Sequence, residues 1–139
     1  MASARRRVSA AMAARLAPGE RVLAGGFAWV AVPRPRVPLL VLQRRPHLLG
    51  LTDRRVMLWH RPRRNRPVDD SHVVFAAEHG ELTLVGVHPR RPMFQIRLRT
   101  EDERELVVEL RPRERELARK LVAALDRPDT LVPAPAAAN

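Results

Sequence analysis

The clearest pattern in the chain is the alternation of apolar and polar residues between positions 94 and 110. The apolar members are Phe94, Ile96 and Leu98 in the first half and Leu106, Val108 and Leu110 in the second. A period of two places every second side chain on the same face of a β-strand. With Glu101–Glu103 as the loop, these segments predict a β-hairpin whose apolar side chains share one face and whose Arg99 lies opposite Glu105.

Further strand-like segments occupy the chain between positions 21 and 87. They are Arg21–Val32, Val37–Gln43, His47–Thr52, Arg55–His60, Val73–Ala77 and Glu81–Val87. The second and third are either two strands or one strand broken near Pro46. Gly25-Gly26 predicts a bulge or bend in the first strand. Asp53-Arg54 predicts a tight turn, and His79-Gly80 predicts a hairpin that joins the last two strands.

At both ends of the chain the apolar spacing is that of a helix. Val8, Met12 and Leu16 predict a short helix over residues 3–16. A second helix is predicted from Pro112 to the residue before Pro128. Its apolar stripe consists of Leu117, Leu121, Ala124 and Leu125. An α+β fold follows: a short helix, about seven antiparallel strands, a closing helix, and a tail too poor in apolar residues to fold.

Composition narrows the class of protein. The 139 residues suit one domain with a single core. The absence of cysteine excludes disulfides, thiol redox chemistry and cysteine-ligated zinc, and it favours a cytoplasmic protein. No segment approaches the roughly 20 apolar residues of a membrane-spanning helix. The sequence therefore predicts a cytoplasmic protein, with peripheral attachment to the inner face of the membrane as one option.

The charge is strongly basic and unevenly distributed. The formal net charge is +11, and Lys120 is the only lysine among 26 basic residues. Residues 33–66 contain ten arginines and a single acid, Asp53. A basic surface attracts polyanions such as nucleic acid or anionic lipid, although an arginine-rich composition also arises in a GC-rich genome.

Two short motifs resemble those of bacterial pleckstrin-homology-like (PH-like) domains. The first is Leu16-Ala17-Pro18-Gly19-Glu20-Arg21-Val22-Leu23, and the second is Leu49-Gly50-Leu51-Thr52-Asp53-Arg54-Arg55-Val56-Met57-Leu58. The resemblance covers residues 16–126 and departs from the family pattern at Gly25-Gly26. It implies a bent antiparallel β-barrel or sandwich of about seven strands, with the C-terminal helix capping one open end. The chain then divides into an N-terminal helix or arm (1–16), a PH-like domain (17–127) and a disordered Pro/Ala tail (128–139).

The resemblance also implies a place for a ligand. Pro33–Val37 and Arg61–Pro67 would be loops at the same open end, where relatives of this fold bind lipid phosphates. The arginines of these loops would converge on one anion, which the planar guanidinium binds in a bidentate manner. They are Arg34, Arg36, Arg61, Arg63, Arg64 and Arg66. The alternative is a solvated basic surface or a protein contact, and the acidic turn Glu101–Glu103 would partly cancel the field there.

The chemistry-bearing residues indicate binding rather than catalysis. Asp69-Asp70-Ser71-His72 contains the residue types of a triad, but a triad is assembled in space and not by adjacency. The five histidines are scattered, so no catalytic residue, metal ligand or cofactor is expected. Asp53 is expected to stabilise its own turn, and an Asp53–Arg55 pair would be structural. Whether Trp29 and Trp59 lie in the core or on the surface stays open.

The sequence therefore predicts a non-enzymatic PH-like adaptor domain. Its basic loops would contact a protein partner or an anionic, phospholipid-like surface. One alternative is an accessory protein that binds nucleic acid through phosphate contacts without reading the bases. Another is a structural subunit that assembles through a strand edge or the N-terminal helix.

Overall fold

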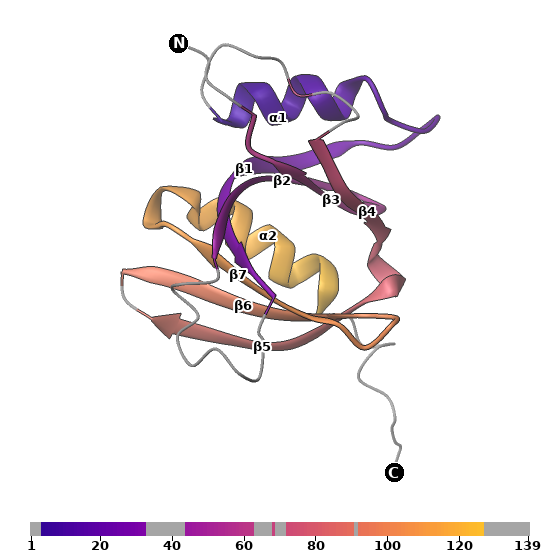
Figure 1. Cartoon of the computed structure of the whole chain (residues 1–139). Coiled ribbons are helices and arrows are strands. Elements are labelled where there is room, and N and C mark those ends of the chain that lie inside the picture. The colour runs from indigo at the N-terminus through magenta and orange to yellow at the C-terminus, as the bar shows by residue number, and fades with distance from the viewer. Residues whose placement is uncertain (1–3, 33–43, 63–67, 69–71, 91, 127–139) are drawn as a thin grey trace.

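The chain folds into a single antiparallel sheet that curls into a half-barrel, with one helix inside the curl and one outside it (Figure 1). The computed structural model describes residues 4–32, 44–62, 68, 72–90 and 92–126. Its elements are α1 (Ala4–Ala13), β1 (Val22–Ala31), β2 (Arg45–Thr52), β3 (Arg55–His60), β4 (Val73–Glu78), the 3₁₀ helix η3 (His79–Glu81), β5 (Leu82–Arg90), β6 (Met93–Thr100), β7 (Glu105–Leu110), the 3₁₀ helix η4 (Pro112–Glu114) and α2 (Arg115–Leu125). The α+β class is confirmed.

The strand order is β4-β3-β2-β1-β7-β6-β5. Strand β1 pairs with β2 along most of its length and with β7 at its C-terminal end, so it bends from one half of the sheet into the other. The predicted hairpin between 94 and 110 is confirmed as β6 and β7, and Arg99 pairs with Glu105. The predicted segments Val37–Gln43 and 128–139 lie outside the described residues.

The predicted hairpin around His79-Gly80 is wrong. Strands β4 and β5 are the two opposite edges of the sheet, and each pairs with a different neighbour. The connection between them is η3, whose His79 bonds to the β2–β3 turn: its backbone N–H donates to the Arg54 carbonyl, and its Nε2 lies 3.0 Å from the Thr52 carbonyl. These long-range bonds hold the chain at a corner, where it passes from one half of the sheet to the other.

The glycine pair in β1 does not form the predicted bulge. The irregularity in the pairing lies between Val22 and Ala24 instead. A Cβ on Gly25 would lie 2.5 Å from the Val8 side chain, and one on Gly26 would lie 2.5 Å from both carboxylate oxygens of Glu114. The glycines are therefore needed for close approach: α1 packs against β1 at Gly25, and Glu114 packs against it at Gly26.

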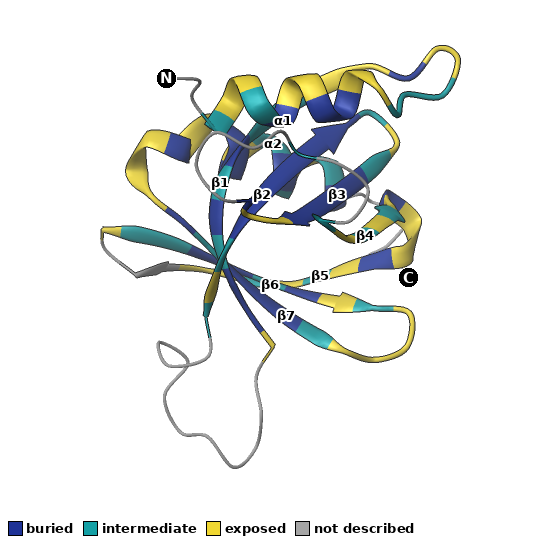
Figure 2. Ribbon diagram, turned by 45° about the horizontal axis from the view of Figure 1, so that its top comes forward, coloured by how far each residue is buried: buried dark blue, intermediate teal, exposed yellow. Residues whose placement is uncertain are grey.

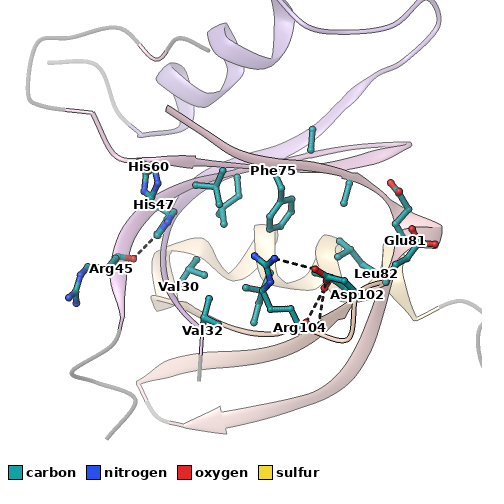
Figure 3. A pocket seen from close by; sticks show the side chains of 17 residues that line it. Val30, Val32, Arg45, His47, His60, Phe75, Glu81, Leu82, Asp102 and Arg104 are labelled. Carbon is teal, nitrogen blue, oxygen red and sulfur yellow. Dashed lines mark hydrogen bonds and ion pairs between the residues drawn. The ribbon is translucent and has the colours of Figure 1, made fainter. Parts of the chain in front are cut away.

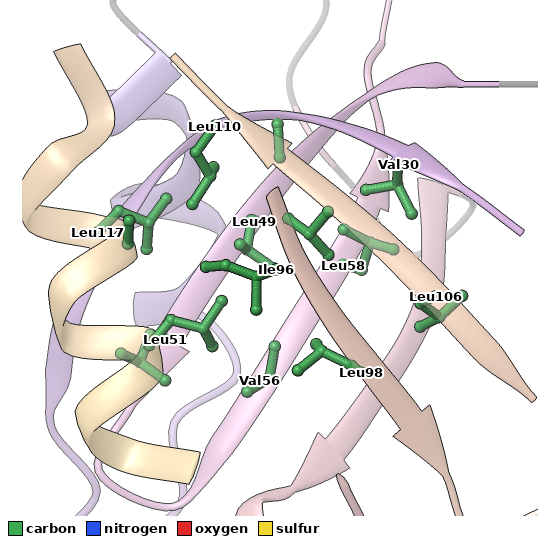
Figure 4. Packing of buried hydrophobic residues seen from close by; sticks show 14 of the residues in the cluster. Val30, Leu49, Leu51, Val56, Leu58, Ile96, Leu98, Leu106, Leu110 and Leu117 are labelled. Atoms are coloured by element: carbon green, nitrogen blue, oxygen red, sulfur yellow. The ribbon is translucent and has the colours of Figure 1, made fainter. Parts of the chain in front are cut away.

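The main core lies inside the curl and is closed by α2. Leu117, Leu121 and Leu125 are all buried there. Figure 4 shows Leu49, Leu51 and Ile96 between the strands and the helix. The one-sided apolar stripe read from the sequence is thus the surface that seals this end of the half-barrel.

A second, smaller cluster lies on the outer face of the sheet, beneath α1. The helix contributes Val8, Ala11 and Met12, and the strands contribute Leu48, Met57 and Trp59. Figure 2 shows buried positions on the underside of α1 and exposed positions on its other side. The helix ends at Ala13, three residues earlier than predicted, because the chain then turns toward Pro18-Gly19. The location of the tryptophans is now clear: Trp59 is fully buried and Trp29 is half-buried.

The β2–β3 turn is held by a buried carboxylate rather than by Asp53. Glu20 accepts hydrogen bonds from the Thr52 hydroxyl, the Arg55 guanidinium and the Ala17 N–H. The Thr52 hydroxyl in turn accepts the backbone N–H groups of the turn. Arg55 forms its ion pair with Glu20, so the structural role considered for an Asp53–Arg55 pair is taken by Glu20. Asp53 accepts the Arg21 N–H.

Candidate functional site

The end of the half-barrel away from α2 is open and contains a pocket of about 810 Å³ (Figure 3). Its apolar floor is formed by Val30, Leu58, Phe75, Ala77, Leu82 and Leu106. Four of these, Val30, Leu58, Leu82 and Leu106, also belong to the main core. None of the described lining residues belongs to α2. The floor of the pocket is thus the part of the core that no helix covers.

The rim of the pocket carries charges of both signs. Arg45 and Arg104 are the arginines among the described lining residues, and Glu81, Glu101 and Asp102 are the acids. The three acids outnumber the two arginines, although the protein as a whole has a formal charge of +11. The described rim is therefore not an electropositive cradle for a phosphate.

The acidic side of the rim is ordered by the β6–β7 turn. Asp102 accepts a hydrogen bond from the Thr100 hydroxyl, which lowers the pKa of its carboxyl, and Arg104 is a further cause of this shift. The Arg104 guanidinium donates to Asp102 over 3.1 Å. Glu103 adopts a positive φ of 65° in this turn, which is an uncommon conformation for a residue other than glycine. Asp102 and Arg104 are thus engaged with each other within the turn.

The opposite side of the rim carries two neighbouring histidines. His47 on β2 pairs with His60 on β3, and their ring centroids are 5.0 Å apart. His47 is buried, and its Nδ1 lies 2.8 Å from the Arg45 carbonyl. Burial lowers the pKa of His47 from its ordinary value of 6.5, the bond to Arg45 opposes this shift, and His60 adds to it. The site therefore favours a neutral imidazole, whose Nδ1 donates to the Arg45 carbonyl and whose Nε2 is left as a hydrogen-bond acceptor.

The predicted anion site falls largely outside the described residues. Of its six arginines, only Arg61 is described, and its guanidinium lies over the Phe27 ring at 5.2 Å from the centroid. Arg61 does not line the pocket. Arg34, Arg36, Arg63, Arg64 and Arg66 belong to segments 33–43 and 63–67, which are not described. Their convergence on one anion stays a prediction.

The described ends of these two segments do border the pocket. Val32 precedes residues 33–43, Arg45 follows them closely, and His60 precedes residues 63–67 by three positions. All three side chains line the pocket. Glu101 and Asp102 of the acidic turn line the same pocket.

The sequence reading missed the histidine pair and the apolar floor. A signal for the pair was present, because a hairpin centred on Asp53-Arg54 places His47 opposite His60. No comparable signal marked Phe75 and Ala77. The sequence pattern of a strand shows which residues are apolar but not whether a helix covers them.

The described residues contain no group of three or more histidine, aspartate and glutamate side chains placed to hold a metal ion. No helix in the described ranges is long and apolar enough to cross a membrane.

Comparison with known proteins does not add a function. No family model matches the chain, and no curated protein matches it.

Proposed function

We propose that this chain is a non-enzymatic, PH-like adaptor domain that binds an apolar segment of a protein partner in its open-end pocket. The observation that carries the proposal is the apolar floor of a pocket of about 810 Å³, which continues directly into the main core. Ligand pockets of this size, roughly 300–1,000 Å³, combine apolar walls with a few polar groups. Phe75 and Ala77 in this floor are only partly buried, and covering their remaining apolar surface with a partner lowers the free energy of the complex.

The fold supports the PH-like part of the proposal. The curled seven-stranded antiparallel sheet, with a C-terminal helix closing one end, agrees with the architecture that the two sequence motifs imply. In the second motif, Thr52 organises the turn, and in the first, Glu20 receives Arg55. Glu20 of the first motif and Arg55 of the second are thus bonded to each other. Such a bond is expected if both motifs belong to one structural element of the fold.

The contacts of the rim support binding rather than catalysis. Asp102 is engaged by Thr100 and Arg104, and His47 is buried against the Arg45 carbonyl. A general base or nucleophile needs a reacting partner within hydrogen-bond reach and a pKa suited to transfer. In the described rim these polar groups serve the local structure and remain available to orient a bound segment.

The balance of charge favours a protein segment over a phosphate in the pocket. With three acids and two arginines on the described rim, an anion inside the pocket would meet more repulsion than attraction. A peptide brings its own donors and acceptors to both sides of the rim. Its apolar side chains can cover Phe75 and Leu82, which lie on facing parts of the pocket in Figure 3.

An anionic membrane surface is the second candidate, and one observation favours it. Both arginine-rich segments are flanked by described residues that line the pocket, namely Val32, Arg45 and His60. Arginines of these segments would then approach a surface that faces the same opening. Each would contribute on the order of 1 kcal/mol of attraction to anionic lipid. Salt would weaken this attachment, whereas it would leave apolar binding in the pocket largely intact.

The test is selection of random peptides on the full chain, followed by a comparison of two alanine-to-tryptophan variants. Ala77→Trp fills the pocket, and Ala123→Trp adds the same side chain at an exposed position of α2. We expect the enriched peptides to be apolar, to bind the Ala123→Trp protein unchanged and to lose affinity for the Ala77→Trp protein. Peptides that bind both variants equally would remove the pocket from the proposal.

Co-sedimentation with phosphatidylglycerol vesicles tests the second candidate. Attachment at low salt that is lost at high salt, and that is unchanged in Ala77→Trp, assigns the open end to a membrane surface. Equal failure to sediment with anionic and neutral vesicles rules the membrane out.

A further inference from the structure

A separate cluster of aromatic and basic side chains lies on the outer face of β1. Phe27 and Trp29 form an edge-to-face pair with ring centroids 5.3 Å apart. The Arg44 guanidinium lies over Trp29 at 4.9 Å, and those of Arg61 and Arg111 both lie over Phe27 at 5.2 Å. We call these five residues the basic aromatic patch. None of them lines the open-end pocket.

The patch forms because β1 presents different residues to its two faces. Ala28 and Val30 point into the main core, so Phe27 and Trp29 point outward. Phe27 pairs with Leu48, which lies beneath α1. The outer face of the sheet is thus covered by α1 on one side, and on the other by guanidinium groups stacked on aromatic rings.

The three arginines of the patch differ in what neutralises them. Arg44 donates to Glu109 over 2.9 Å, and Glu109 also accepts a hydrogen bond from Gln95. Arg61 and Arg111 are exposed, and within the described ranges neither forms an ion pair with a carboxylate. Two guanidinium groups that have no carboxylate partner among the described residues therefore share one aromatic ring.

Stacking prepares these groups to bind an anion. An arginine side chain on an aromatic face loses part of its rotational freedom before any ligand arrives, so less is lost on binding. The edge of the guanidinium stays free to donate two parallel N–H bonds to an oxyanion. The ring thus acts as a support, and the N–H edges of Arg61 and Arg111 act as the contact surface.

We propose that the basic aromatic patch is a docking surface for a carboxylate-rich segment of a partner protein. Charge complementarity carries the choice, since the patch offers two guanidinium forks on a sheet face that no carboxylate of the described part of the chain engages. Nucleic acid would instead use bare rings for base stacking, and here guanidinium groups occupy the ring faces. A membrane anchor would need an aromatic side chain projecting beyond the cations, whereas Phe27 and Trp29 are half-buried beside them. This surface goes beyond the proposed function and does not depend on the pocket.

The experiment uses the full chain and poly-L-glutamate as the probe, at physiological salt. Binding is followed by the fluorescence of Trp29 and by calorimetry. Arg61→Gln/Arg111→Gln removes the two guanidinium forks. Arg21→Gln/Arg119→Gln removes the same formal charge from side chains that are 79% and 63% exposed and lie outside the patch. We expect about a tenfold loss of affinity in the first variant and less than about a threefold loss in the second.

A third variant separates the ring from the charge. Phe27→Leu keeps an apolar side chain and both arginines but removes the aromatic support, so we expect a several-fold weaker interaction at unchanged net charge. Thermal unfolding checks that each variant is folded. Equal losses in the two double variants would overturn the proposal, because only general attraction would then be at work. It would be overturned as well if oligo-dT or phosphatidylglycerol vesicles bound more tightly than poly-L-glutamate through the same two arginines.

Discussion

The two ends of the half-barrel share one hydrophobic core but finish it differently. At the closed end, α2 covers the core with Leu117, Leu121 and Leu125. At the open end, core residues such as Leu82 and Leu106 line a pocket. The comparison shows two ways in which one small core can end: at one end a helix seals it, and at the other it borders the opening that we propose as a binding pocket.

The two ends also differ in the charge state of a buried polar side chain. Toward the closed end, Glu20 lies under the β2–β3 turn with a side chain only 1% exposed, and it is held in the charged form. The Arg55 guanidinium is the main cause of its lowered pKa, about 2 against an ordinary 4.5, with burial opposing and Thr52 and Ala17 assisting. At the open end, burial favours the neutral form of His47. Of these two buried side chains, Glu20 is thus held in the charged form and His47 in the neutral form.

The largest effect expected from this comparison comes from one substitution made at both ends. Leu121→Ala removes a fully buried side chain beneath α2 and leaves a sealed cavity, so we expect a loss of about 4 kcal/mol in the free energy of unfolding. Leu106→Ala removes the same atoms from the pocket wall, where the space joins an existing opening. Only the transfer part of the cost then applies, about 2 kcal/mol. Urea denaturation followed by circular dichroism measures both.

Equal losses in these two variants would contradict the distinction between the ends. The slope of unfolding free energy against urea should be the same in both proteins and in the parent chain. That slope reports the surface exposed on unfolding, so a common value shows that the variants are compared between the same two states.

The next effect tests the buried carboxylate. Glu20→Gln keeps the shape of the side chain but removes the charge that Arg55 needs. From the pKa of about 2 in the folded protein and 4.5 otherwise, the charged form contributes about 3 kcal/mol at neutral pH. Because the folded pKa is the lower one, this contribution is complete above about pH 5 and disappears as the pH falls from 4.5 toward 2. Denaturation of both proteins across this range measures it.

We therefore expect the stability curves of Glu20→Gln and the parent chain to converge in acid. Glu101→Gln is the control, since Glu101 is exposed in the β6–β7 turn and should change the free energy of unfolding by less than about 0.5 kcal/mol. A constant gap between Glu20→Gln and the parent chain down to low pH would show that the cost arises from packing rather than from charge.

A smaller effect compares added volume at the two ends. Ala118→Leu inserts three carbons between α2 and the strands, where the core is filled, so we expect a loss of about 2 kcal/mol. Ala77→Leu places the same carbons in the open pocket, where we expect a change of less than about 0.5 kcal/mol. Thermal unfolding of the two variants, measured side by side, gives both changes in stability. A large loss in Ala77→Leu would mean that the pocket wall cannot accept a side chain, and hence a ligand.

Local periodicity explains which parts of the fold were predictable. The stripe of α2 and the alternation of β6 and β7 are set by neighbours within a few residues, so the sequence pattern contains them in full. The hairpin at His79-Gly80 looked equally local. It failed because His79 bonds to Thr52 and Arg54, more than 20 residues away, and these bonds turn the chain at a corner.

The glycines and the buried carboxylate show the same limit. Gly25-Gly26 was interpreted as a bulge or bend, but the irregularity lies between Val22 and Ala24. The glycines are needed instead for the approach of Val8 and Glu114, which no local rule contains. Glu20 lay inside a recognised motif, yet its partner Arg55 is 35 positions along the chain. The pocket could not be anticipated either, because it depends on where α2 stops covering the core.

The smallest expected effect is a pH dependence that belongs to the open end. The pKa of His47 is below 6.5 in the folded protein because its ring is buried. The unfolded chain therefore binds a proton more readily, so the contribution of His47 is complete above about pH 6.5 and is lost as the pH falls below that value, with a slope of at most about 1.4 kcal/mol per pH unit. This loss begins at a higher pH than the loss from Glu20, which begins near pH 4.5, so one pH series separates the two onsets. His47→Gln should remove the slope, whereas His88→Gln, at an exposed position of β5, should retain it. The NMR resonance of the His47 Hε1 proton measures the pKa of this side chain directly. A pKa at or above 6.5 would mean that the open end does not shield its histidine from water. The contrast between the two ends would then depend on packing alone.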